Sequence, residues 1–220
     1  MSAPTLARWA LALLACVSLS LFALVGCEGD PEVEVATLGT APSSVLAATP
    51  GILSDLLDVD PVTMGAVDDS AWPRCMTKNG SHALLAHPDA VRKALAPSDR
   101  GPRVLVTDLL VAIDRPGAPC SRVFGAAPPN SGVVLVSARE LRNRCSSLPV
   151  AELVGRVAAH ELGHALGLTL PGEGMRCDGR GCHCEDPDCL LADERGGCPQ
   201  ADAALCTRCR LNASRPSPER

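Results

Sequence analysis

The chain has 220 residues and a formal net charge of −5, and its 12 cysteines contrast with two tryptophans, two phenylalanines and no tyrosine. This length suits one domain with a hydrophobic core. The mildly acidic balance, without a polybasic segment, argues against nucleic acid or anionic lipid headgroups as binding partners.

The first 26 residues predict an export signal. One charged residue, Arg8, precedes a mostly apolar stretch at residues 9–25, which is the pattern of a secretory signal. The stretch ends in Leu24-Val25-Gly26-Cys27, which resembles a bacterial lipobox, where cleavage precedes the cysteine and the thiol carries lipid. We therefore expect lipidation of Cys27 and a chain anchored to the bacterial cell envelope, at the outer membrane or the cell surface. An ordinary signal peptide or a single membrane-spanning anchor is the alternative.

Cysteine usage agrees with export. Cys16 leaves with the signal and Cys27 is assigned to lipid, so ten cysteines remain. An even number in an oxidising compartment predicts disulfides by default.

Residues 27–70 are rich in Ala, Pro, Ser, Thr and Asp and show no sustained apolar period. We interpret them as a flexible tether, with one short helix possible at residues 51–58. The folded domain is expected at residues 71–212, followed by a tail at residues 213–220.

Helical and strand patterns alternate within that domain. They predict a helix at residues 88–96, strands at 103–113, 121–126 and 132–137, a helix at 138–143 and a helix at 149–168. Pro149 suits a first helical position, and Gly167 allows the chain to turn at the end of the last helix. This order indicates an α+β fold in which helices cover a small sheet.

The last of these helices carries His160-Glu161-Leu162-Gly163-His164, the H-E-x-x-H pattern. Residues four apart share one helix face, so both imidazoles can bind one zinc ion. Glu161 lies beside them and can act as general base. The alternative is an amphipathic helix that carries two histidines by chance.

Together with Gly167, this pattern resembles the metzincin peptidases, in which a third histidine follows three residues after the glycine. That position here is Leu170, which cannot bind zinc. Further on, the order of one histidine and four cysteines resembles the archaemetzincin signature. The resemblance implies a catalytic zinc on His160, His164 and His183, and a structural zinc on Cys184, Cys189, Cys206 and Cys209.

The resemblance covers roughly residues 88–210, including segments 104–108, 122–126 and 133–139, which are similar to the family's strands. It implies a metzincin-like fold: a small twisted mixed sheet, a backing helix, an active-site helix and a Cys-rich C-terminal lobe.

Two departures from the family pattern concern the catalytic site. Fifteen residues separate Gly167 from His183, where the family has two. Asp178, Glu173 or Asp186 could therefore replace His183 as third ligand, or Glu185 in a gluzincin-type site. Leu191 also stands where the family has a methionine beneath the metal, but the two side chains have similar volumes.

A third departure is that an oxidising compartment favours disulfides over a four-cysteine zinc site. The other six cysteines, Cys75, Cys120, Cys145, Cys177, Cys182 and Cys198, could form three disulfides. Their connectivity is open, although Cys177 and Cys182 could pair to hold the end of the excursion beside the metal.

The sequence thus predicts a zinc metallopeptidase with two zinc ions per chain, acting on a peptide or protein by metal-activated water with Glu161 as general base. The alternative is a catalytically inactive surface module, held together by zinc or disulfides, that binds a partner.

Overall fold

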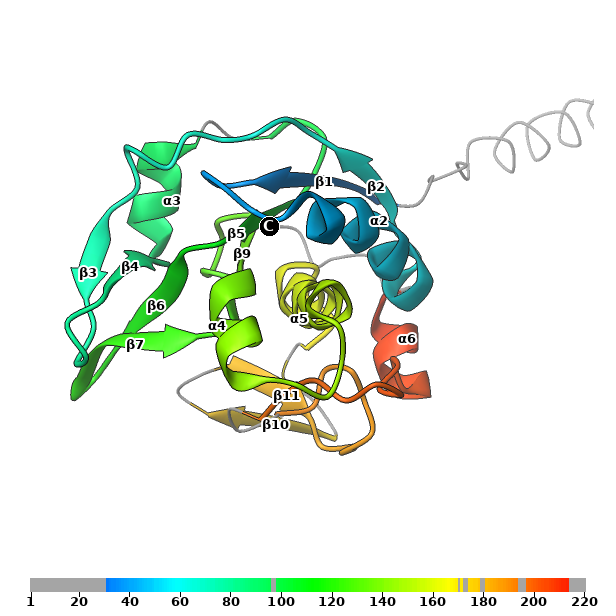
Figure 1. Cartoon of the computed structure of the whole chain (residues 1–220). Helices are drawn as coiled ribbons and strands as arrows, with labels where there is room; N and C mark the ends of the chain where they lie inside the picture. The colour runs from blue at the N-terminus through cyan, green and yellow to red at the C-terminus, as the bar shows by residue number, and fades with distance from the viewer. Residues whose placement is uncertain are drawn as a thin grey trace, which may run out of the picture. The chain divides into compact units, whose positions relative to one another are not determined.

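The computed structural model describes residues 31–95, 98–169, 171, 174–178, 181–193 and 197–213 (Figure 1). The expected signal, Cys16, the lipobox with Cys27, and Leu170 and Glu173 lie outside these residues. Within the described residues, no helix has both the length and the apolar character needed to cross a membrane.

A five-stranded sheet forms the centre of the domain, with the strand order β2-β1-β5-β9-β8. Four of its strands are parallel: β1 (Glu32–Thr37), β2 (Asp60–Thr63), β5 (Arg103–Thr107) and β9 (Val133–Ser137). The short strand β8 (Gly125–Ala126) pairs antiparallel with β9 at one edge. The parallel strands β5 and β9 are almost entirely buried, which explains their continuous runs of branched apolar residues.

Two helices cover one face of this sheet, α2 (Ser43–Leu57) and α5 (Val150–Ala165). Alternate strand residues such as Val104 and Val134 point into the core that these helices complete. The helices cross closely at Gly155, where a β-carbon would lie 2.5 Å from Ile52 Cδ1. The expected α+β fold with a backing helix and an active-site helix is therefore confirmed.

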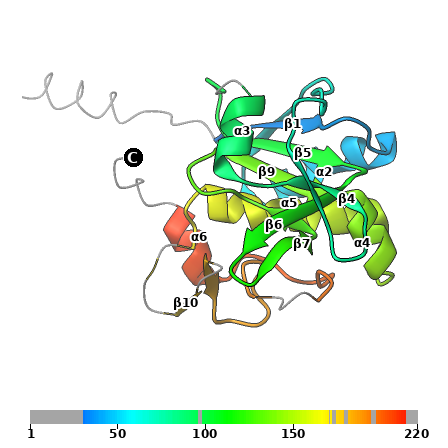
Figure 2. The same ribbon diagram turned by 90° about the vertical axis from the view of Figure 1, so that its left-hand side faces the viewer.

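The opposite face of the central sheet packs on a second core. Leu105 and Leu135 meet Trp72, Leu84 and Val91 there. These partners come from a four-stranded sheet, from the segment before it and from α3 (Pro88–Ala94). The sheet has the order β3-β4-β6-β7, comprising β3 (Arg74–Met76), β4 (His82–Leu85), β6 (Leu110–Arg115) and β7 (Ala118–Val123) (Figure 2).

A disulfide closes this smaller sheet on itself. Cys75 on β3 and Cys120 on β7 lie on opposite edge strands, yet their Cα atoms are 5.8 Å apart. Three strand spacings in a flat sheet would separate them by about 14 Å. The sheet is therefore strongly curled, with Ala83, Leu110 and Ala112 buried beside the disulfide.

The tether predicted for residues 27–70 is wrong for the residues that the structure describes. A single compact unit begins at Pro31. Strand β1 is buried from Val33 to Thr37 and pairs with β5, whose residues lie about seventy positions further along the chain. Its short alternation could not be recognised as a strand without that distant partner. The short helix expected at 51–58 is the second half of α2, which continues through Pro50.

The predicted strand at residues 103–113 is in fact two strands that belong to different sheets. The chain breaks between β5 and β6, where the Thr107 hydroxyl accepts a hydrogen bond from the Leu109 backbone N–H. Ser137 donates its own hydroxyl to the Leu109 carbonyl. The predicted helices correspond to α3, α4 (Ala138–Arg144) and α5.

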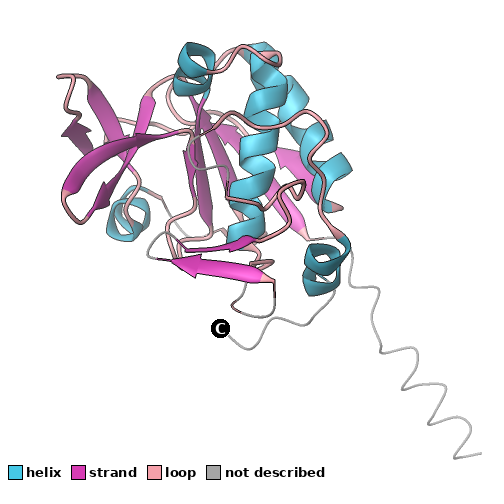
Figure 3. Cartoon of the chain, turned by 90° about the horizontal axis from the view of Figure 1, so that it is seen from below, coloured by secondary structure: helices cyan, strands magenta, loops and turns pink. Residues whose placement is uncertain are grey.

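The C-terminal lobe begins with a hairpin of two strands, β10 (Met175–Asp178) and β11 (Gly181–Cys184), and ends with α6 (Thr207–Ala213) (Figure 3). Cys184, Cys189, Leu191 and Cys209 from this lobe join the same buried core as α5. The Cys145–Cys198 disulfide ties the end of α4 to the lobe. The predicted Cys-rich lobe therefore packs on the active-site helix.

Candidate metal centres and active site

Helix α5 sets the positions of two histidines. Pro149 precedes the helix, and one side of it is buried through residues such as Leu153, Val157 and Leu162. The helix ends at Ala165, and Gly167 just beyond it has a φ of +76°, in the left-handed region that glycine adopts without strain. This burial pattern leaves His160 and His164, one turn apart, half-buried on the same face.

His183 on β11 completes a group of three imidazoles. The ligand atoms of His160, His164 and His183 all lie within 4.8 Å of one another, and the two Nε2 atoms on α5 are 3.1 Å apart. A tetrahedral zinc with Zn–N bonds of about 2.0–2.1 Å would space its ligand atoms by roughly 3.3–3.4 Å. The three histidines can therefore hold one zinc ion.

The other described candidates for the third zinc ligand lie outside the histidine group. Asp186 is exposed and does not belong to the histidine group, and neither does Glu185. Glu173 and the side chain of Asp178 lie outside the residues that the structure describes. Among the described candidates, the structure brings only His183 to the two helical histidines.

Two hydrogen bonds orient the helical imidazoles. His160 Nδ1 lies 2.8 Å from the backbone carbonyl oxygen of Leu190, and His164 Nδ1 lies 2.8 Å from Thr169 Oγ1. A carbonyl oxygen only accepts, so Nδ1 of His160 carries the proton and Nε2 keeps its lone pair for a metal. Neither partner could be predicted from the sequence, because a backbone carbonyl and a lone threonine have no recognisable pattern.

The protonation states suit metal binding. Burial, aided by the charges of His160 and His183, lowers the pKa of His164 to about 3. Its imidazole is therefore neutral, which is the form that binds a metal. Burial raises the pKa of Glu161, whereas His160 and a backbone hydrogen bond from Ala127 act in the opposite direction. A carboxylate with a raised pKa is a stronger base than an ordinary exposed one.

Leu191 forms the apolar floor beneath the helical histidines. Its side chain is fully buried, and a β-carbon at Gly163 would lie 2.5 Å from Leu191 Cδ2. Gly163 therefore lets this leucine approach the helix between His160 and His164. The sequence-based expectation that leucine can replace methionine as a hydrophobic floor agrees with this packing.

Edge strand β8 lies beside Glu161. A β-carbon at Gly125 would lie 2.9 Å from Glu161 Cγ and 2.6 Å from Val157 Cγ1. The absence of a side chain at this glycine therefore lets β8 approach the active-site helix closely.

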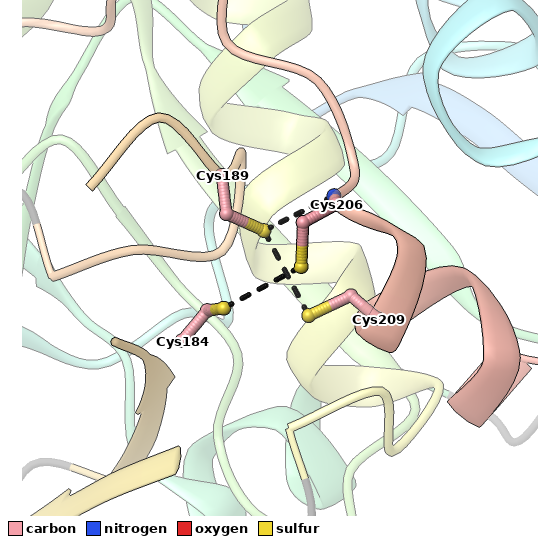
Figure 4. A group of neighbouring side chains, drawn as sticks. All are labelled: Cys184, Cys189, Cys206 and Cys209. Atoms are coloured by element: carbon pink, nitrogen blue, oxygen red, sulfur yellow. Dashed lines mark hydrogen bonds between the residues drawn. The ribbon is translucent and has the colours of Figure 1, made fainter. Parts of the chain in front are cut away.

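A second group consists of Cys184, Cys189, Cys206 and Cys209 (Figure 4). The Sγ atoms of Cys184 and Cys206 are 3.6 Å apart, and those of Cys189 and Cys209 are 3.7 Å apart. Tetrahedral zinc with Zn–S bonds of about 2.3 Å spaces its sulfurs by roughly 3.8 Å. All four cysteines are free, so this group can hold a second zinc ion.

The thiols of this group need a cation before all of them can ionise. Burial raises the pKa of Cys184 to about 11 and also raises that of Cys209, and the charge of Cys189 adds to both shifts. A zinc ion neutralises the mutual repulsion of the thiolates. The site therefore fits a divalent metal better than it fits four unliganded thiolates.

The six remaining cysteines form the three disulfides that were predicted. They pair as Cys75–Cys120, Cys145–Cys198 and Cys177–Cys182. The sequence suggested the last pair, but the first two join residues 45 and 53 positions apart and required the tertiary structure.

No protein-family model matches the sequence, and no curated protein matches it. The fold is similar to that of the archaemetzincin of Methanopyrus kandleri, with a TM-score of 0.56 and 20% identity, over 86% of this chain and 96% of that one. It is also similar to the archaemetzincin of Archaeoglobus fulgidus, solved with malonate, with a TM-score of 0.55 and 17% identity over 82% and 99% of the chains.

A zinc-dependent peptidase from Methanocorpusculum labreanum gives a TM-score of 0.51 and 19% identity, over 82% of this chain and 99% of that one. These likenesses, together with the histidine group on α5 and β11 and the Cys-rich lobe, show that the chain has an archaemetzincin-like fold over most of its length.

Proposed function

We propose that this protein is a zinc-dependent peptidase that hydrolyses peptide bonds in peptide or protein substrates. The observation that carries the proposal is the convergence of His160, His164 and His183, with Glu161 on the same helix. Zinc bound by these imidazoles supplies a Lewis acid that polarises the substrate carbonyl and acidifies water. The fold likeness to zinc-dependent peptidases supports the same function.

Glu161 acts as the general base. Its carboxylate accepts a proton from the attacking water and then delivers that proton to the leaving amine. The backbone N–H of Ala127 donates a hydrogen bond to this carboxylate. Because burial raises its pKa, proton transfer in both directions is easier than for an exposed carboxylate.

Strand β8 offers a binding site for the substrate backbone. Among the strands that the structure describes, β8 pairs only with β9, so its other side can add an extended peptide as a further strand. Gly125 in this strand lies against Glu161, so a peptide added here would pass the general base. We therefore propose that the substrate binds in an extended conformation.

The test is Glu161→Gln, with Glu152→Gln on the same helix as matched control. Glu152 pairs with Arg156 at 2.7 Å and does not belong to the histidine group. We expect Glu161→Gln to retain two zinc ions per chain and to lose peptide hydrolysis, whereas Glu152→Gln retains both. Zinc binding by an unaltered chain that cleaves no peptide would favour the alternative, a surface-binding module.

We also propose that the protein is exported and anchored through lipid on Cys27. The lipobox-like sequence supports this proposal, as do the three disulfides, which are typical of oxidising compartments. Metabolic labelling with palmitate should mark the unaltered chain but not Cys27→Ala. Equal labelling of both would exclude Cys27 as the lipidation site.

A further inference from the structure

The third histidine stands on an element that has little support of its own. His183 lies on β11, which pairs with β10 in a two-stranded sheet of four residues per strand. Within the described part of the chain, neither strand pairs with any strand of the two larger sheets. An isolated hairpin of this length is marginally stable in water. His160 and His164, by contrast, stand on a 16-residue helix that is packed into the core.

The residues on either side of His183, Cys182 and Cys184, are each fixed by a bond to another part of the lobe. Cys182 pairs directly with Cys177 across the hairpin, and a disulfide joins them. Cys184 belongs to the four-cysteine group, and its backbone N–H donates to the Leu191 carbonyl at 2.8 Å. His183 is therefore fixed from one side by a covalent bond and from the other by the four-cysteine group.

The disulfide lies at the end of a long segment that leads from the active-site helix to His183. Fifteen residues separate Gly167, at the end of the helix, from His183. The entropy lost when such a segment is ordered grows with its length. The Cys177–Cys182 disulfide spans only five positions, so it does not close the whole segment, but it fixes the hairpin at the end of the segment, directly beside His183. One hydrogen bond, from the Glu185 N–H to the Gly174 carbonyl at 3.0 Å, closes the base of the hairpin beside it.

We infer that the Cys177–Cys182 disulfide is a positioning element that holds His183 in place as the third metal ligand. This inference rests on the proposed zinc peptidase function. It implies that the catalytic zinc site reaches full affinity only after this pair of cysteines is oxidised, whereas the four-cysteine site requires its thiols reduced.

The experiment compares the unaltered chain with Cys177→Ser/Cys182→Ser and with Cys75→Ser/Cys120→Ser as matched control. The control also removes one disulfide, but one that joins two strands of the four-stranded sheet and whose cysteines belong to neither ligand group. Zinc content and zinc dissociation constants are measured by competition with a chromophoric chelator, and kcat and KM are measured on the same samples. The zinc held by the four cysteines serves as an internal measure of folding.

We expect Cys177→Ser/Cys182→Ser to bind the catalytic zinc about 10- to 100-fold more weakly while it retains the other zinc, as is typical when the support of a metal ligand is lost. With saturating zinc its kcat should recover in part. The control should bind both zinc ions as tightly as the unaltered chain does. Unchanged affinity for the catalytic zinc in Cys177→Ser/Cys182→Ser would overturn the inference.

A loss of both zinc ions would mean that the variant had unfolded. In that case the zinc affinities of Cys177→Val/Cys182→Val test the inference. A cross-strand pair of valines supports the hairpin without a covalent bond. A lower affinity for the catalytic zinc in this folded variant supports the inference, and an unchanged affinity overturns it. If the unaltered chain binds no zinc at the histidine group, the proposed function fails instead, so the two failures can be distinguished.

Discussion

The backbone carbonyl of Leu190 accepts a hydrogen bond from His160 Nδ1 at 2.8 Å, and Leu190 directly follows Cys189 of the four-cysteine group. One histidine of the candidate catalytic site is thus oriented by the residue next to a ligand of the other candidate metal site. His183 and Cys184 are also adjacent in the chain. The two sites therefore share backbone at two points, and we expect changes in one to affect the other.

Loss of the four-cysteine site should reduce activity. Cys209 is fully buried on α6 and contacts Cys189, but it does not belong to the histidine group. We expect Cys209→Ala to lower the zinc content from two ions to one and to lower kcat at least tenfold, because the Leu190 carbonyl loses its support. Metal analysis with kinetics on one sample checks this. Full kcat with a single zinc per chain would contradict the coupling.

The reverse coupling should be weaker. His160→Ala removes one imidazole of the catalytic site and leaves all four cysteine thiols in place. We expect this variant to lose hydrolysis and one zinc ion while it keeps the second zinc, which metal analysis of the purified variant measures. A variant that loses both zinc ions would show that the four-cysteine site depends on the catalytic metal.

Thr169 should tune the affinity of the catalytic zinc. Its side chain is buried, and its hydroxyl oxygen is the partner of His164 Nδ1. Thr169→Val has nearly the same shape but leaves Nδ1 of His164 without this hydrogen bond, so we expect the catalytic zinc to bind about 10-fold more weakly. Thr169→Ser keeps the hydroxyl and should restore the affinity. Equal zinc affinity in the valine and serine variants would exclude a role for this hydrogen bond.

Gly125→Ala should disturb catalysis more than stability. The new methyl group would meet Glu161 Cγ at 2.9 Å and Val157 Cγ1 at 2.6 Å, so the general base or strand β8 must shift. We expect kcat to fall at least tenfold while the zinc content is unchanged. Gly51→Ala, which meets no neighbour and lies in helix α2, is the matched control and should keep full activity. Full activity in Gly125→Ala would show that the close approach of β8 to the general base is not needed.

The disulfide between Cys75 and Cys120 should contribute to stability but not to catalysis. It closes a segment of 45 residues, for which the chain-entropy estimate is about 4 kcal/mol. For a domain of this size, that loss corresponds to a fall in Tm of roughly 8–16 °C. Calorimetry of Cys75→Ser/Cys120→Ser measures the shift. An unchanged Tm would show that the curled sheet holds its shape without the covalent bond.

Local patterns were sufficient where an element carries its own signal. Helix α5 has an amphipathic period, a proline before its start and a glycine just beyond its end, so its existence, its start and its two histidines could be predicted, although it ends at Ala165 and not at Leu168. Strand β1 has no such signal, because six residues with a short alternation become a strand only when β5 supplies hydrogen bonds. The predicted strand at residues 103–113 failed for the same reason, since two sheets share one apolar run.

The sequence by itself supplied the candidate groups: two histidines and a carboxylate on one helix, four cysteines that the resemblance to archaemetzincins assigned to a second zinc, and an even set of six further cysteines. Only the tertiary structure decided which groups meet. It brings His183 to α5 at the end of a fifteen-residue excursion, and it pairs Cys75 with Cys120 and Cys145 with Cys198. The physical reason is that spacing along a helix fixes distance within a few residues, whereas contacts between distant segments depend on how the sheets and the core pack.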